Sequence, residues 1–230
     1  MNARAVPNVG EHRDYVAAAI CVIVVVLAGF SIDAPLLSHL GSVSLLVRAH
    51  GLIMLTWIML FFAQALLVAR HRVDLHMHLG IFGAALAVAV VVADTATLIT
   101  ACRLGGNHMP HMPAPLFLAL GLFNLSTFAI LVGAAIVLRK RRSDWHKRLM
   151  LLATCSIILP VIGRLPMGPL ADFLVFYACV LIPAIVDSMR HRRVHPAFGW
   201  GAPLLIASQH LAFLGATTQA WGHFVTRLFA

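Results

Sequence analysis

Charged residues are scarce in this chain. Only 11% of its 230 residues are Asp, Glu, Lys or Arg, whereas soluble domains carry about 25%. Hydrophobic residues make up 61% of the chain, and the mean hydropathy is +0.92. This composition excludes a soluble globular domain, a disordered chain, a collagen and a disulfide scaffold. It predicts a polytopic membrane protein.

Cysteine and lysine are also rare. None of the four cysteines forms a C-x-x-C pair, and three lie inside apolar runs, where we expect them to pack as small hydrophobic residues. The only lysines, Lys140 and Lys147, belong to one basic segment between apolar runs. Because no lysine lies in the middle of an apolar run, the sequence disfavours the Schiff-base chemistry of rhodopsins.

Acidic residues are outnumbered by basic ones, 8 to 17, which gives a net charge of +9. On a soluble fold such an excess would suggest a nucleic-acid partner. Here the basic residues form short clusters between long apolar runs, which is the pattern of cytoplasmic loops in membrane proteins. We therefore expect no nucleic-acid partner, and the lipid bilayer is the partner that the composition implies.

Seven apolar segments are long enough to cross a bilayer as helices. The predicted spans are roughly 15–37, 43–69, 77–101, 114–138, 148–167, 169–189 and 198–220. The predicted fold class is an all-α bundle of seven transmembrane helices. No run of Gly, Ser or Pro divides the chain into two halves, so we expect a single integral membrane domain over residues 1–230.

The orientation follows from the basic residues. Thirteen of the 17 lie in the N-terminal segment or near the connections at 70–76, 139–147 and 190–196. The positive-inside rule then places the N-terminus in the cytoplasm and the C-terminus outside. Pro160 and Pro183 lie within predicted helices and should kink them, because proline removes a backbone hydrogen bond.

Several polar side chains lie in the outer third of the predicted bundle. An ionisable group at bilayer depth costs about 2.5–3.5 kcal/mol, so each one is a candidate functional residue. Counting the helical rise places His50, Asp94 and Arg164 at one depth, where Asp94 could neutralise Arg164. We therefore expect loss of Asp94 to cost more stability than loss of Asp187. The alternative is a structural polar contact without a ligand. The predicted polar cluster consists of Arg48, Asp94, Asn124 and Arg164.

Polar residues recur at helical spacing in three of the predicted spans. The stripes are His50, Trp57 and Gln64; His76 and Asp94; and His146 and Arg164. We expect each stripe to face the bundle interior. At the cytoplasmic end, His76, His78 and His146 are candidate metal or cofactor ligands beside Gln64, because neutral imidazole is a common metal ligand.

Short motifs in this region resemble those of a family of bacterial membrane proteins of unknown function. The family has a His and a Gln on one helix, H-x-x-x-G at the start of the next, and H-x-x-x-M opening a later helix that ends in Arg. The matching residues here are His50, Gln64, His76, Gly80, His146, Met150 and Arg164. The resemblance covers residues 48–166, a core of helices at about 43–167, and implies a location in the bacterial inner membrane.

This four-helix core is similar to the membrane domains of ferric reductases and di-haem cytochromes b. The similarity implies a redox protein that binds a b-type haem and exchanges electrons with a quinone or another small molecule. The implied axial ligands are His76 or His78 together with His146, with Gln64 as an orienting group and His50 as a further cofactor-binding residue.

Two other functions remain open. The pair His191-x-x-x-His195, together with seven helices and an Asp in the third, resembles the zinc-containing ceramidase and adiponectin-receptor superfamily, which implies a zinc-dependent membrane hydrolase. The third hypothesis is a non-enzymatic protein that binds a lipid or small molecule. It rests on two predicted helix N-termini that lie at the same interface as Lys147 and Arg148. Helix N-termini and cations both attract phosphate groups.

Overall fold

Seven helices of the computed structural model are long and apolar enough to cross a membrane. The structure describes residues 9–32, 44–103 and 113–229. The described helices are α1 (Val9–Ile32), α3 (Leu45–Ala69), α4 (Val73–Arg103), α5 (Ala114–Leu138), α6 (Ser143–Ser156), α7 (Leu159–Ile162), α8 (Pro169–His191), α9 (Pro196–Ala216) and α10 (Gln219–Phe229). The predicted all-α polytopic bundle is confirmed.

Local sequence explains where several helices begin. The Ser44 hydroxyl accepts a hydrogen bond from the Val47 N–H and caps α3. Proline occupies the first turn of α5, α8 and α9, where its missing N–H is not needed. Helix α4 begins at Val73, four residues earlier than predicted, so His76 lies on the same helix as His78 and not in the preceding connection.

The predicted fifth span is interrupted. Helix α6 ends at Ser156, and the short helix α7 resumes at Leu159. Pro160 explains the break, because it has no N–H for the helical ladder. The fifth predicted span is therefore present as Ser143–Ile162, but it consists of two helical segments, and Arg164 lies in a turn after α7 and not on the helix. Pro183 has a milder effect, since α8 continues through it as one helix.

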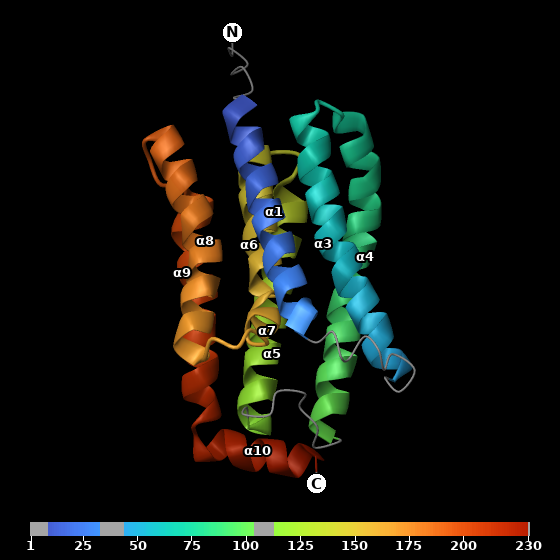
Figure 1. Ribbon diagram of the computed structural model, residues 1–230, viewed down its shortest axis with the longest axis vertical. Helices are drawn as coiled ribbons and strands as arrows, with labels where there is room; N and C mark the ends of the chain where they lie inside the picture. Colours follow the sequence, from blue (N-terminus) through green and yellow to red (C-terminus); the bar gives the residue numbers. More distant parts are fainter. Residues whose placement is uncertain (1–8, 33–43, 104–112, 230) are drawn as a thin grey trace.

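The helices run roughly side by side, with α1 in front of α6 and beside α3 (Figure 1). Helices α3, α5 and α6 meet at Trp57, which is 2% exposed. Its indole N–H donates to the Thr154 hydroxyl at 3.3 Å, and its ring packs edge-on against Phe128 with 4.9 Å between centroids. Trp57 therefore faces the interior, as the stripe on its helix predicts.

The last helix, α10, lies across one end of the bundle (Figure 1). The predicted span 198–220 is too long, because α9 ends at Ala216. The Trp221 indole N–H donates to the Pro115 carbonyl at 2.8 Å, and Val225 packs against Leu98 and Leu118. Most other side chains of α10 are exposed. Such a helix suits the membrane interface, where one face contacts the bundle and the other meets headgroups or water.

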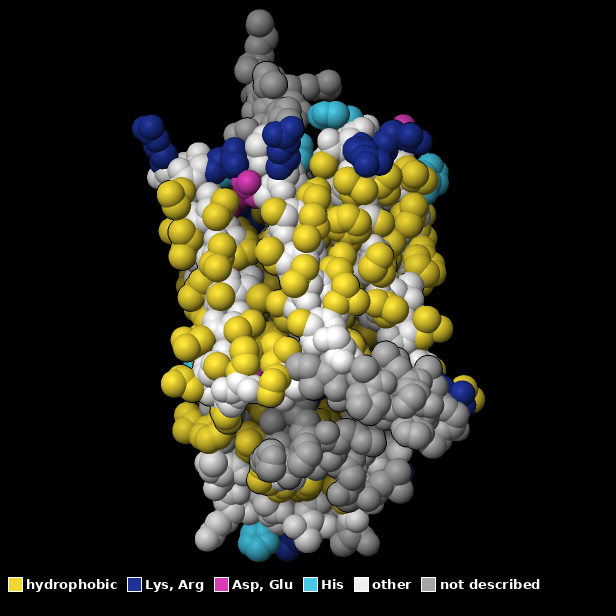
Figure 2. Space-filling view, viewed as in Figure 1, with side chains coloured by type: hydrophobic (Ala, Val, Ile, Leu, Met, Phe, Trp, Pro, Cys, Tyr) yellow, Lys and Arg dark blue, Asp and Glu magenta, His cyan; other side chains and the backbone are white. Residues whose placement is uncertain are grey.

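The lateral surface is apolar and the charges gather at its ends. Side chains such as Ile81, Val137 and Leu170 are each more than 70% exposed. Figure 2 shows this apolar surface, with Lys and Arg side chains concentrated at the end that carries the N-terminus of α1. Exposed apolar side chains of this kind are normal where lipid replaces water as the solvent. The chain is an integral membrane protein.

The clustering of the basic residues leads to a prediction of topology. In a variant without native cysteines, a cysteine introduced at position 141 should react with a membrane-impermeant maleimide only after cells are opened. A cysteine at position 223 on α10, at the opposite end of the bundle, should react in intact cells. Efficient labelling of position 141 in intact cells would contradict the orientation given by the positive-inside rule.

Candidate functional site

A buried ion pair joins α6 to α8 at the basic end of the bundle. The side chains of Arg148 and Asp187 are 3% and 5% exposed. Arg148 donates from Nε and Nη2 to the two carboxylate oxygens at 3.1 and 2.6 Å, which is bidentate pairing. Its Nη1 donates to the Asp144 carbonyl at 2.7 Å. The guanidinium is thus fully engaged although it is shielded from water.

Glu11 brings α1 into the same cluster. Its carboxylate accepts from the Arg148 guanidinium at 3.3 Å and from the Lys147 ammonium. The side chain is only 12% exposed. The two acids and the two bases balance, so their charges tie the ends of α1, α6 and α8 together at the basic end of the bundle without a further ion.

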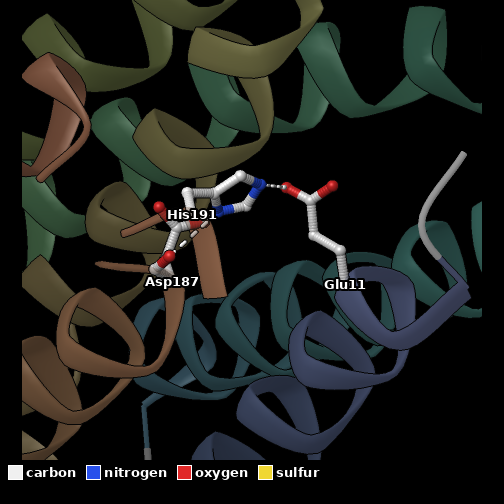
Figure 3. Close-up of side chains that lie close together, drawn as sticks. All are labelled: Glu11, Asp187 and His191. Atoms are coloured by element: carbon white, nitrogen blue, oxygen red, sulfur yellow. Dashed lines mark hydrogen bonds and ion pairs between the residues drawn. The ribbon is translucent and has the colours of Figure 1, made fainter. Parts of the chain in front are cut away.

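His191 completes a group that has the composition of a metal site. Its ring lies 3.7 Å from Glu11 and 3.6 Å from Asp187, and one ligand atom from each residue falls within 4.8 Å of the others (Figure 3). A divalent cation would add positive charge where Arg148 and Lys147 already neutralise both carboxylates. The contacts therefore favour an ion-pair cluster over a metal centre. A polar cavity of about 220 Å³ adjoins this cluster.

The zinc pair predicted at His191 and His195 does not form. Helix α8 ends at His191, and Arg192 adopts a left-handed conformation with φ of 54°, so the two histidines do not share a helical face. His195 instead caps α9, where its Nδ1 accepts from the Ala197 N–H at 3.1 Å. Its Nε2 donates to the Asp144 carboxylate at 2.9 Å. Both ring nitrogens are engaged, so His195 offers no atom to a metal.

Two of the predicted histidine ligands do approach one another. The rings of His76 on α4 and His146 on α6 have centroids 6.4 Å apart and planes at 77°. The His146 Nδ1 lies 2.9 Å from the Ala135 carbonyl, to which it donates. His78 points elsewhere: it is exposed, and its Nδ1 bonds to the Asp74 carbonyl at 2.8 Å.

Gln64 lies beside this pair. The His76 ring contacts the Gln64 backbone, and a Cβ placed on Gly80 would be 3.9 Å from the Gln64 amide nitrogen. Gly80 is one turn after His76, so the H-x-x-x-G motif presents one face of α4 to Gln64. The His76 Nδ1 and the Gln64 Oε1 are buried without a hydrogen-bond partner among the described residues. Buried polar atoms of this kind are uncommon in native structures.

The outer polar cluster is divided in the structure. His50 Nδ1 lies 3.8 Å from the Asp94 carboxylate. The Arg164 guanidinium lies 5.0 Å from the Phe30 ring centre and is close enough to His50 to act on it electrostatically. Arg48 is exposed, so its predicted place in the cluster is wrong: its position on α3 does not face the bundle interior.

Asn124 also leaves the predicted cluster. It is buried on α5, where its carbonyl oxygen accepts from the Gln209 amide at 2.5 Å. Gln209 belongs to α9, and both side chains are less than 5% exposed. Asn124 is therefore paired across the α5–α9 interface and away from Asp94.

Sequence reasoning missed the acidic half of the Arg148 cluster. Glu11 precedes the first apolar run, Asp187 lies near the end of the sixth, and the sequence assigns Arg148 to the basic residues near a connection. The spacing between acidic and basic residues along the chain contained one signal of these contacts. Asp144 precedes Arg148 by four residues, and Asp187 precedes His191 by four, so each pair shares a helical face.

Comparison with known proteins gave no match among family models, curated proteins or solved structures.

The buried ion pair reverses one expectation from the sequence. Asp187→Ala should lower the free energy of unfolding by about 3–5 kcal/mol, because it leaves the Arg148 guanidinium buried without its carboxylate. Asp94→Ala should cost less, since Asp94 is 26% exposed and its described partner is a histidine. Thermal unfolding in one detergent compares the two variants. A double variant, Asp187→Leu with Arg148→Met, should recover most of the loss; equal melting temperatures for the two single variants would contradict the assignment.

His195 should make stability depend on pH. Burial lowers the pKa of His195, and the hydrogen bond to Asp144 only partly opposes this. The unfolded chain, with a histidine pKa of about 6.5, then binds a proton first as the pH falls. The contribution of His195 to the stability of the fold is therefore complete above about pH 6.5. It is lost as the pH falls from there towards the lower pKa of His195 in the folded state.

His195→Asn tests this titration while keeping a capping side chain on α9. Its melting temperature should fall less than that of the wild type between about pH 7 and 5. His223→Asn, a change at an exposed position on α10, is the control and should leave the pH dependence as it is. An unchanged pH dependence in His195→Asn would show that another group titrates.

Proposed function

We propose that this protein is a membrane redox protein that holds a b-type haem between His76 and His146. The observation that carries the proposal is the approach of these two imidazoles from different helices, with 6.4 Å between ring centres. A metal ion binds each imidazole nitrogen at about 2 Å, so two axial imidazoles on one ion have ring centres about 6 Å apart. The spacing of the pair therefore fits bis-imidazole ligation.

The surroundings of the pair support the same role. The hydrogen bond from His146 Nδ1 to the Ala135 carbonyl fixes the ring and leaves Nε2 as the nitrogen with a free lone pair. Metal-bound histidines commonly have such a partner on the other ring nitrogen. A bound haem would supply one-electron chemistry, and the protein would hold the ligand rings and limit their contact with water.

A single transition-metal ion is the second candidate for this site. Gln64 of α3 lies beside α4 at Gly80, one turn from His76. The unpartnered Gln64 Oε1 and His76 Nδ1 would then join His146 as nitrogen and oxygen ligands. Imidazole with an oxygen ligand suits copper, iron or zinc.

The cellular setting of the proposal is the bacterial inner membrane. The density of basic residues at one end of the bundle supports a cytoplasmic position for the His76–His146 pair. Electrons would then pass between the cytoplasmic half of the membrane and a quinone or another small molecule.

Absorption spectroscopy and metal analysis test the proposal together. Protein expressed with a haem precursor should show a Soret band that shifts on reduction with dithionite. His76→Ala and His146→Ala should lose that band, whereas His78→Ala should retain it, because His78 is exposed and bonded to its own helix.

The remaining outcomes are also decisive. Colourless protein with one equivalent of copper, iron or zinc, lost in His76→Ala, would replace haem by the single-ion candidate. Colourless protein that stays free of metal after incubation with each ion would refute both forms of the proposal.

A further inference from the structure

The polar cavity of about 220 Å³ lies at the basic end of the bundle, beside the first turns of α6 and the last turn of α8. A water molecule takes up about 30 Å³ in the liquid, so this volume suits a group of about seven non-hydrogen atoms. All seven described residues that line the cavity have ionisable side chains. The lining shares no residue with the His76–His146 pair, so an inference drawn from it does not rest on the proposed redox function.

Three of these side chains are committed to protein contacts. Each nitrogen of the Arg148 guanidinium donates to a protein oxygen. Both ring nitrogens of His195 are engaged. The Glu11 carboxylate is 12% exposed and already accepts from Lys147 and Arg148. A ligand in the cavity must therefore be recognised by other residues of the lining.

Two cations of the lining are accessible. Arg193 is exposed, and among the described residues its side chain has no hydrogen-bond or ion-pair partner. Lys147 is 30% exposed, and its bond to Glu11 leaves further N–H groups of the ammonium able to donate. Guanidinium and ammonium groups are the usual donors to phosphate oxygens in proteins. The cavity can therefore bind an anionic group.

The same cavity also has accessible acceptors. The Asp144 side chain is 52% exposed, and its carboxylate accepts from His195 at 2.9 Å. A carboxylate has about four acceptor sites, so Asp144 can bind a further donor. His191 adds an acceptor, because its Nδ1 donates to the Asp187 carbonyl at 2.9 Å and leaves the Nε2 lone pair free. The cavity can therefore bind an ammonium group as well.

The full charges around the cavity balance. The three bases are Lys147, Arg148 and Arg193, and the three acids are Glu11, Asp144 and Asp187, which pairs with Arg148 behind the lining. A ligand with a net charge would leave this group unbalanced where it is only partly open to water. A zwitterion adds no net charge, because its anionic part can bind Arg193 while its cationic part binds Asp144.

We propose that this cavity binds the phosphoethanolamine group of a phosphodiester, with the phosphate on Arg193 and Lys147 and the ammonium on Asp144. The two cations belong to α6 and to the connection between α8 and α9, so they can contact different oxygens of a tetrahedral phosphate. A phosphodiester carries one negative charge, which the ammonium group neutralises.

Two sources can supply this group. The cavity lies where the spans that end at Ser143 and His191 leave the membrane, which is the level of phospholipid headgroups. Phosphatidylethanolamine of the adjoining leaflet is one source. Glycerophosphoethanolamine, the same headgroup without acyl chains, is the water-soluble one.

Isothermal titration calorimetry on the detergent-purified full chain, in a buffer without phosphate, tests the phosphate contact. Wild-type protein should bind one glycerophosphoethanolamine. Arg193→Gln should weaken binding roughly tenfold, because it removes hydrogen bonds to a charged group. Arg192→Gln is the matched control and should bind like the wild type, since this neighbouring arginine is also exposed but does not line the cavity.

A second ligand tests the ammonium contact. Glycerophosphoglycerol has the phosphodiester without the ammonium group, and wild-type protein should bind it roughly tenfold more weakly. Asp144→Asn keeps a side chain that can cap α6 and accept from His195, but it loses the charge. This variant should bind glycerophosphoethanolamine roughly tenfold more weakly than the wild type and glycerophosphoglycerol equally well. Its retained binding of glycerophosphoglycerol would show that the cavity is intact.

Dihexanoyl phosphatidylethanolamine distinguishes the two sources. If it binds at least tenfold more tightly than glycerophosphoethanolamine, the group comes from the lipid leaflet; equal affinities indicate the free ester, and both results support the site. Absence of binding by either compound, unchanged affinity in Arg193→Gln, or a wild-type affinity for glycerophosphoglycerol equal to that for glycerophosphoethanolamine would each overturn the proposal. Equal affinity for β-alanine, a zwitterion with a carboxylate in place of the phosphate, would also overturn it.

Discussion

The arginine buried among three helix ends is the constraint on which the basic end of this molecule depends. A guanidinium that is only 3% exposed must be fully paired, or the bundle carries an uncompensated charge away from water. Arg148 meets this requirement with Asp187 of α8 and Glu11 of α1. Those two contacts hold α1 and α8 against α6 at this end.

The same cluster divides the surroundings of α6 into two environments. Arg148 and Lys147 face α1 and α8, where their pairing positions Tyr15 beside an apolar cavity. His146, one residue earlier, faces α4 and meets His76. One turn of helix thus supplies a candidate cofactor ligand on one side and the buried ion pair on the other.

The outer half of the bundle uses its polar residues differently. His50 with Asp94 joins α3 to α4, and Asn124 with Gln209 joins α5 to α9. Each is a contact between two neighbouring helices, and polar pairs of this kind hold transmembrane helices together at a modest gain in stability. Their separation favours a structural role for these residues.

The sequence by itself determined the class of fold, the number of spans and the face of α3 that carries Trp57. These features depend on local properties: apolar length, helical period, and residues such as Ser44 and Pro160 that begin or interrupt a helix. It also brought His76, His146 and Gln64 together as candidates, because they lie on inward-facing stripes near one end of the bundle.

Only the tertiary structure decided which polar group meets which. Asn124 pairs with Gln209 and not with Asp94, His195 caps α9 next to Asp144 and not a metal, and Asp187 neutralises a buried arginine. The physical reason is that a partner is set by the order and rotation of helices around the bundle, and by where a helix such as α8 stops. Those quantities arise from packing between distant segments, so spacing along the chain cannot specify them.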